Sequence, residues 1–160
     1  MINETSTAPR PGATSRLPLL NGHSMPRIGL GTWPMLDAEC EQAVRCAVQT
    51  GYRLVDTAVQ YRNEEAVGRG IRTAGVPRAE LFISSKFNKE SHSVDGVRRA
   101  YDESLRKLRV DYLDMFMCHW PVPALGWHRP FFSSRYLADF RLFLFHAVMQ
   151  KKRPARPVFG

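Results

Sequence analysis

Short apolar runs alternate along the chain with longer segments in which apolar residues recur at helical spacing. The short runs are Leu54-Val55, Leu81–Phe87 and Tyr112–Trp120, and each has the length of a buried strand. Arg27–Trp33 is a similar run that ends at Gly and Pro, so it also suits a buried strand better than a helix. We therefore expect four strands separated by helices.

The segments between these runs carry helix start and stop signals. We expect Asp37 to cap the first helix, whose apolar positions are Cys40, Ala43, Val44 and Ala47 and whose stop is Thr50-Gly51. Asn63 is expected to cap the second helix, which has Glu64 and Glu65 in its first turn and ends at Gly75 and Pro77. The third helix has an apolar stripe at Val94, Val97, Tyr101, Leu105 and Leu108.

The order of these elements predicts an α/β fold. Parallel strands need a crossover helix, so strands separated by helices of this length pair in parallel. Before them, Leu17–Leu20 and His23–Pro26 flank Asn21-Gly22, which is typical of a tight hairpin turn. We divide the chain into a flexible leader (1–16), an α/β unit with a leading hairpin (17–121) and a C-terminal segment of different composition (122–160).

The last segment concentrates the aromatic residues and the positive charge. It holds 8 of the 17 aromatic residues and 7 basic residues against 1 acidic residue, whereas residues 1–121 hold 16 basic and 14 acidic residues. We expect a helix over 137–150 that packs its Phe-rich face on the sheet, followed by a solvated basic tail. A membrane-surface or nucleic-acid role for this end is the alternative. The nearly balanced body gives no reason to propose specific nucleic-acid binding.

Other sequence features suggest a cytoplasmic protein without a membrane anchor. The three cysteines lack zinc-binding spacing, and their odd number argues against a secreted disulfide framework. The first sixteen residues carry no targeting signal. The longest apolar run, Phe140–Met149, is about half of the ~20 residues that a spanning helix needs.

Ionisable side chains come at the ends of three successive predicted strands. Asp56, Lys86 and His119 end these strands, and Tyr61 lies in the loop after Asp56. Each residue alone has an ordinary structural explanation. Because the carboxyl ends of parallel strands face one shared crevice, we expect the four side chains to lie near each other. Cys118 and His119 are neighbours along a strand and are not expected to form a nucleophilic pair.

These four groups suit the reduction of a carbonyl. A phenol with a pKa of about 10 is a weak acid at neutral pH unless a cation favours its phenolate, and Lys86 can supply that charge. Asp56 can hold Lys86 as an ammonium, and His119 can orient the carbonyl oxygen. Because no metal or flavin signature is found, a nicotinamide is the economical hydride donor.

The motifs around these residues resemble the aldo-keto reductases, and in particular the shorter bacterial diketogluconate-reductase-like members. They are Met25–Trp33 after the hairpin, Gly51–Ala58 through Tyr61 and Asn63-Glu64, Ser84–Lys86, and Leu113-Asp114 through His119–Pro121.

The resemblance implies a (β/α)8 barrel, NADPH as cofactor and a small carbonyl substrate. It makes Tyr61 the proton donor, Lys86 its pKa modulator, Asp56 the partner of Lys86, and His119 the group that orients the carbonyl. It also implies that Gly31, Thr32 and Asp56 lie near the nicotinamide and that Trp33, His119 and Trp120 line the substrate pocket.

The resemblance covers residues 17–121, about four βα units and so half of a barrel. In this family the groups that grip the cofactor phosphates come mostly from later strands. One hypothesis is therefore a reductase, active alone or after two half-barrels associate through open sheet edges. The alternative is a catalytically silent truncated or frame-shifted fragment that acts through partner binding. A basic nucleic-acid module ranks last.

Overall fold

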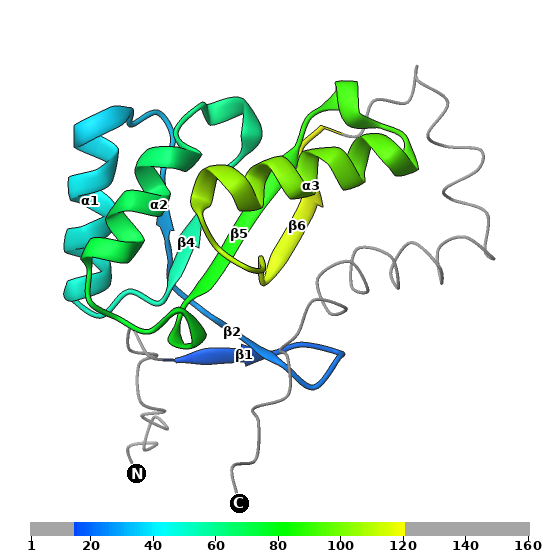
Figure 1. Cartoon of the computed structure of the whole chain (residues 1–160). Coiled ribbons are helices and arrows are strands. Elements are labelled where there is room, and N and C mark those ends of the chain that lie inside the picture. The colour runs from blue at the N-terminus through cyan, green and yellow to red at the C-terminus, as the bar shows by residue number, and fades with distance from the viewer. Residues whose placement is uncertain (1–14, 121–160) are drawn as a thin grey trace, which may run out of the picture.

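The structure, a computed structural model, describes residues 15–120, which form a parallel sheet covered on one face by helices (Figure 1). The sheet order is β3-β4-β5-β6, and all neighbours are parallel. Its strands are β3 (Leu30–Gly31), β4 (Leu54–Asp56), β5 (Phe82–Phe87) and β6 (Met115–Cys118). Helices α1 (Asp37–Gln49), α2 (Glu64–Thr73) and α3 (Val94–Leu108) connect them. The predicted alternation of strands and helices is confirmed.

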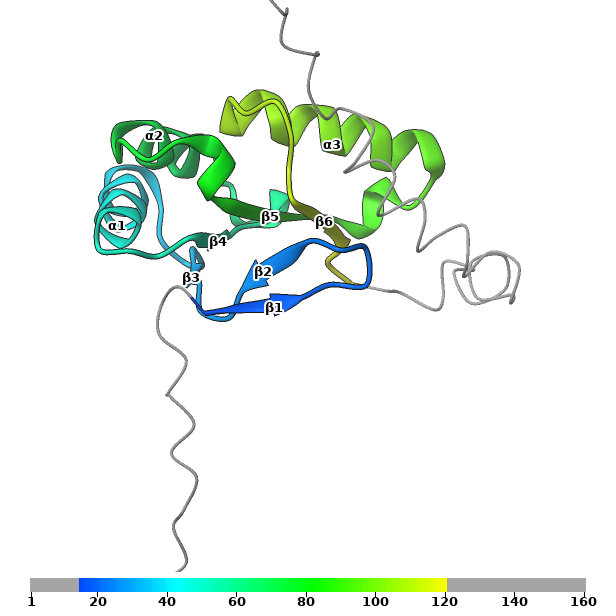
Figure 2. The ribbon, with the colours of Figure 1, turned by 90° about the horizontal axis from the view of Figure 1, so that it is seen from below.

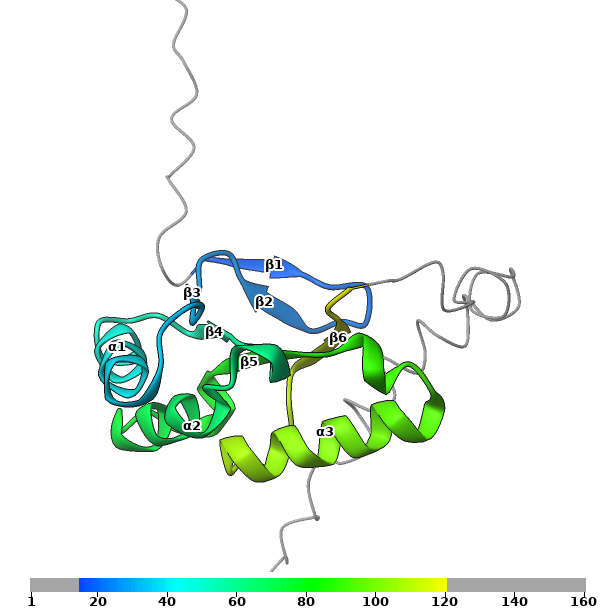
Figure 3. The ribbon, with the colours of Figure 1, turned by 90° about the horizontal axis from the view of Figure 1, so that it is seen from above.

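Short elements complete this framework. The predicted hairpin is formed by β1 (Arg16–Pro18) and β2 (Ser24–Pro26), and Gly22 in its turn has a φ of 79°. Figures 2 and 3 show the hairpin on the side of the sheet away from the three helices. Three 3₁₀ helices lie in the loops, at η1 (Val59–Tyr61), η2 (Arg78–Glu80) and η3 (Lys89–Ser91). Among residues 15–120, none of the helices is both long and apolar enough to cross a membrane.

Three local expectations were wrong. Asp37 is the first residue of α1 rather than its cap, because the carbonyl of Leu36 already accepts the first turn's hydrogen bond from the N–H of Cys40. The run Arg27–Trp33 contributes only two residues to the sheet, with Gly31 exposed, because β3 lies at the end of the described sheet and pairs only with β4. Val94 is exposed at the start of α3, so the buried stripe of that helix begins at Val97.

The core lies between the sheet and the helices. Period-two alternation turns Ile83, Ser85 and Phe87 of β5 toward the helices, while Ser84 and Lys86 face the other side. Ile83 and Phe87 are fully buried within one hydrophobic cluster. The helical members of that cluster recur at helical spacing and include Val44, Val48, Val67, Ile71, Tyr101, Leu105 and Leu108. Burial of these stripes holds the three helices against the sheet.

Helix α2 approaches both of its neighbours through glycines. A Cβ at Gly70 would come within 2.6 Å of the backbone oxygen of Glu41 in α1. A Cβ at Gly68 would overlap the backbone of Leu108 at the end of α3. Because glycine has no side chain, α2 can pack at this short distance from α1 and α3. Helix α2 begins directly after the loop that carries Tyr61.

An ion pair between Arg78 and Asp114 connects the segments at the amino-terminal ends of β5 and β6. The guanidinium of Arg78 donates to Oδ2 of Asp114 at 2.7 Å and to the carbonyl of Tyr112 at 2.8 Å. The same Asp114 oxygen accepts the backbone N–H of Ile83 at 2.9 Å. Asp114, part of a motif that suggested the family resemblance, thus lies at the start of the strands rather than at their carboxyl ends.

Replacing Gly68 by Ala is expected to destabilise the fold. The added methyl group meets backbone rather than a flexible side chain, so α2 or the end of α3 must shift, at a cost of about 1–3 kcal/mol in the free energy of unfolding. Denaturant unfolding measures this difference. Gly31→Ala is the control, because nothing lies within 4 Å of its added methyl group. Equal stability of Gly68→Ala and the parent chain would contradict the packing described.

Candidate active site

The four predicted catalytic side chains come together at the carboxyl ends of the strands. Asp56 ends β4, Lys86 lies near the end of β5, His119 follows β6, and Tyr61 ends η1. Nζ of Lys86 lies 2.7 Å from Oδ2 of Asp56 and 5.1 Å from the centre of the Tyr61 ring. The rings of Tyr61 and His119 meet edge to face, with centroids 5.5 Å apart. The expectation that these groups share one mouth of the fold is confirmed.

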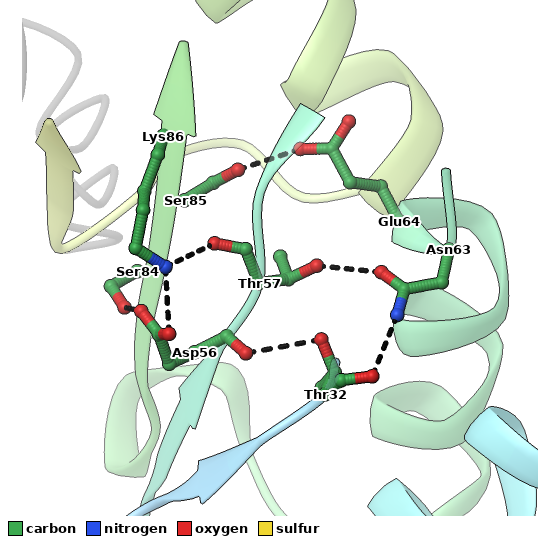
Figure 4. A network of polar contacts seen from close by, with 8 residues as sticks. All are labelled: Thr32, Asp56, Thr57, Asn63, Glu64, Ser84, Ser85 and Lys86. Atoms are coloured by element: carbon green, nitrogen blue, oxygen red, sulfur yellow. Dashed lines mark hydrogen bonds and ion pairs between the residues drawn. The ribbon is translucent and has the colours of Figure 1, made fainter. Parts of the chain in front are cut away.

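Strand register explains why Asp56 meets Lys86. Asp56 is paired with Ser84 across β4 and β5, and Ser84 shares a face with Lys86 two residues later. Asp56 therefore accepts hydrogen bonds from Lys86 through Oδ2 and from the Ser84 hydroxyl through Oδ1. The carbonyl of Thr57 accepts a second hydrogen bond from the Lys86 ammonium at 2.9 Å. The ammonium thus has two fixed acceptors (Figure 4).

A buried amide fixes the loops around this ion pair. Asn63 holds the predicted N-cap position of α2, but its side chain makes no capping hydrogen bond. Its Nδ2 instead donates to the carbonyls of Thr32 and Met35, both at 2.9 Å, and its Oδ1 accepts the Thr57 hydroxyl at 2.8 Å. One side chain therefore joins the loops after β3 and β4 (Figure 4). Sequence reasoning missed this role because cap residues and loop-bridging residues are of the same types.

His119 lies in an environment that favours its neutral form. Burial lowers the pKa of its imidazole below the ordinary 6.5, the Lys86 ammonium lowers it further, and Asp56 acts in the opposite direction. Its backbone N–H donates to the carbonyl of Phe87 at 3.0 Å, which holds the residue beside the end of β5. A neutral imidazole carries one N–H, so it can donate a hydrogen bond to a carbonyl oxygen.

The two predicted substrate-lining tryptophans lie at this mouth. The Trp33 ring is 5.4 Å from the Tyr61 ring, and the Trp120 ring stacks on His119 at 5.6 Å. Their exposed fractions are 64% and 59%, so their faces are open to a ligand. An open pocket of about 730 Å³ is lined by Trp120 together with Gln60 and Asn88, whereas Trp33 and the four candidate catalytic side chains do not line it.

The residues predicted to lie near a nicotinamide differ in accessibility. Gly31 is exposed and nothing lies within 4 Å of the position of a Cβ, so a flat ring could approach its backbone. Thr32 is fully buried, and its hydroxyl donates to the carbonyl of Asp56 at 3.1 Å. Its backbone N–H donates to the same carbonyl. Gly31 therefore leaves room for a ligand at this mouth, whereas Thr32 contacts Asp56 through two hydrogen bonds to its backbone carbonyl.

Cys118 makes a contact that the sequence did not predict. Its Sγ lies 3.3 Å from Nε2 of His92. Burial raises the pKa of the Cys118 thiol and lowers the pKa of His92, so both groups are favoured in their neutral forms and the thiol is not activated as a nucleophile. All three cysteines are free. Within the described range, no three His, Cys, Asp or Glu side chains gather as a metal site requires.

Comparison with known proteins identifies relatives of this chain. The Aldo/keto reductase family model matches residues 27–141. An aldo-keto reductase of Mycolicibacterium smegmatis is 44% identical over 108 residues, which is 68% of this chain and 39% of that protein. A methylglyoxal reductase of Escherichia coli is 44% identical over 107 residues, which is 67% of this chain and 38% of that protein. The chain thus spans about two fifths of the length of these relatives.

Solved structures agree with the sequence comparison. An aldo/keto reductase from Brucella melitensis superposes with a TM-score of 0.68 at 33% identity, over 81% of this chain and 48% of that one. A Bombyx mori aldo-keto reductase in complex with NADP gives a TM-score of 0.63 at 40% identity, over 67% of this chain and 38% of that one. The predicted partial (β/α)8 barrel is confirmed for the described residues, while the expected C-terminal helix and tail lie outside them. The chain belongs to the aldo/keto reductase family.

Proposed function

We propose that this chain carries the catalytic residues of an NADPH-dependent reductase that converts small aldehydes or ketones to alcohols. The observation that carries the proposal is the convergence of Tyr61, Lys86, Asp56 and His119 at one mouth of the sheet. The methylglyoxal reductase among the relatives suggests small aldehydes of that kind as substrates.

Tyr61 is the proton donor in this proposal. NADPH, when bound, supplies the hydride, that is, both electrons of the reduction. The carbonyl oxygen then gains negative charge and takes a proton from the phenol of Tyr61. The Lys86 ammonium lies 5.1 Å from the centre of the Tyr61 ring, where its positive charge can offset the negative charge left on the phenol oxygen.

Asp56 and His119 have separate supporting roles. Asp56 holds the Lys86 ammonium in place, and Ser84 orients the carboxylate through its second oxygen. His119 approaches the substrate oxygen from the side opposite Tyr61 and donates a hydrogen bond to it. The lowered pKa of His119 keeps the imidazole in the neutral form, which can donate this bond. Trp33 and Trp120 offer apolar faces to the remainder of the substrate.

Removal of the Tyr61 hydroxyl tests this function directly. We expect the full chain to oxidise NADPH in the presence of methylglyoxal or nitrobenzaldehyde, and Tyr61→Phe to lower the rate by about 10²–10⁴-fold, the usual contribution of a general acid. Loss of the reduced-nicotinamide absorbance measures the rate. Tyr52→Phe makes the same chemical change in the loop after α1 and is the matched control. No turnover at saturating NADPH, or equal rates for Tyr61→Phe and the parent, would reject the proposal in favour of a silent fragment.

The positive charge of Lys86 is expected to lower the pKa of the His119 imidazole. Burial is the largest cause of the lowered His119 pKa and the Lys86 cation is the next, so Lys86→Met should raise this pKa toward the ordinary 6.5. Asp56, freed from its partner, acts in the same upward direction. Proton NMR of the imidazole over a pH titration measures the change. Lys89→Met removes an exposed cation of η3 and should leave the His119 titration unchanged. A His119 pKa unaffected by Lys86→Met would contradict the electrostatic coupling described.

A further inference from the structure

Glu64 places a carboxyl group inside the fold directly behind the candidate site. The residue begins α2 and is only 2% exposed. Its Oε1 accepts a hydrogen bond from the Ser85 hydroxyl at 2.7 Å. Among the described residues, no cation lies within ion-pair distance of this carboxyl. A negative charge on this buried carboxyl is unfavourable, because a buried ion loses its hydration and needs a partner of opposite charge to compensate.

Two buried oxygens at this location have no hydrogen-bond partner within residues 15–120. They are Oε2 of Glu64 and Oγ of Ser104, which faces the carboxyl from α3. A proton on Oε2 turns the carboxyl into a donor, and the Ser104 hydroxyl oxygen is an available acceptor. The neutral acid can therefore bond to both Ser85 of the sheet and Ser104 of α3 without a buried charge.

The local electrostatics agree with a neutral carboxyl. Burial raises the pKa of Glu64 above the ordinary 4.5, while the hydrogen bond from Ser85 and the nearby Ser104 hydroxyl lower it in part. The charged groups that face it come from α3, where Lys107 lowers this pKa and Glu103 raises it. Lys86 follows Ser85 in β5, but it points to the opposite face of the sheet, toward Asp56 (Figure 4).

The hydrogen bond between Glu64 and Ser85 lies close in the chain to residues of the candidate active site. Glu64 follows Asn63 and lies three residues after Tyr61, while Ser85 immediately precedes Lys86. Figure 4 shows two adjacent tethers from the start of α2: Asn63 reaches Thr57, and Glu64 reaches Ser85. The second tether therefore joins the segment that carries Tyr61 to the strand that carries Lys86.

We propose that Glu64 is a neutral carboxylic acid at physiological pH and acts as a positioning residue, holding β5 at Ser85 so that Lys86 keeps its place relative to Tyr61. The positioning role rests on the proposed function, in which Lys86 assists Tyr61. The protonation state of Glu64 does not depend on that function.

The proposal determines how stability changes with pH. The folded chain keeps the Glu64 proton at pH values where the unfolded chain has lost it. The stabilisation linked to this group is therefore complete below about pH 4.5 and is lost as the pH rises through the raised folded pKa. Glu103 does not titrate in this range, because hydrogen bonding to Arg106 lowers its pKa to about 2. Gln at position 64 cannot ionise and removes this part of the pH dependence.

The test compares Glu64→Gln with Glu64→Ala in the full chain. Carbon NMR of the glutamate carboxyls identifies the Glu64 signal by its absence in Glu64→Gln, and this signal should still be that of a protonated carboxyl at physiological pH. Glu64→Gln should fold. Between acid and neutral pH, its urea midpoint of unfolding should fall by less than the midpoint of the parent chain. Glu64→Ala should have a lower midpoint than the parent at every pH in this range. The pKa of His119 reports the position of the Lys86 ammonium. This pKa should be the same in Glu64→Gln as in the parent chain and should be shifted in Glu64→Ala. If Glu64→Ala does not fold, Ser85→Ala removes the same tether and should shift the His119 titration.

Two results would overturn this inference. One is a Glu64 carboxyl that is ionised at physiological pH, and the other is a Glu64→Gln variant that is as unstable as Glu64→Ala or shifts the His119 titration equally. Unchanged His119 titration in both Glu64→Ala and Ser85→Ala would reject the positioning role. Absence of reductase activity together with the expected titrations would reject the proposed function and leave the neutral carboxyl of Glu64 intact.

Discussion

The ion pair between Lys86 and Asp56 is the contact on which the arrangement of the candidate site depends. It joins the carboxyl ends of two neighbouring parallel strands and places a cation 5.1 Å from the Tyr61 ring. The same cation lowers the pKa of His119, which follows the next strand. One charged group therefore lies close to both a phenol and an imidazole, because parallel strands bring their carboxyl ends to one edge.

This ion pair is supported by buried polar groups. Ser84 and Thr57 supply the remaining partners of Asp56 and Lys86, and Asn63 holds Thr57 in turn. Such hydrogen bonds are directional, so they restrict the loops more tightly than apolar packing alone. On the other side of β5, the helices pack against an apolar surface that Ser85 interrupts. The start of α2 takes part in both layers, through Asn63 and Glu64.

Much of the fold could be predicted from local patterns, but the details of several residues could not. Hydrophobic periodicity located α1, α3 and the strands β4 to β6, because burial of one face dominates their energetics, and start and stop signals located α2. Asp37 was assigned as a cap because its type suits one, whereas Leu36 holds the cap position of α1. Asn63 does hold the cap position of α2, but no local pattern showed that its amide bridges two loops. The contact between Cys118 and His92 joins residues 26 positions apart, which no local pattern reveals.

The sequence by itself determined the order of elements, the parallel sheet and the gathering of Tyr61, Lys86, Asp56 and His119 at one edge. These follow from apolar spacing and from the rule that strands connected by helices run in the same direction. Only the tertiary structure decided that Asp56 contacts both Ser84 and Lys86, that His119 is favoured in its neutral form, and that Glu64 is buried with no ion-pair partner among residues 15–120. Those properties depend on strand register, burial and neighbours from distant segments, and they arise only when the chain has packed.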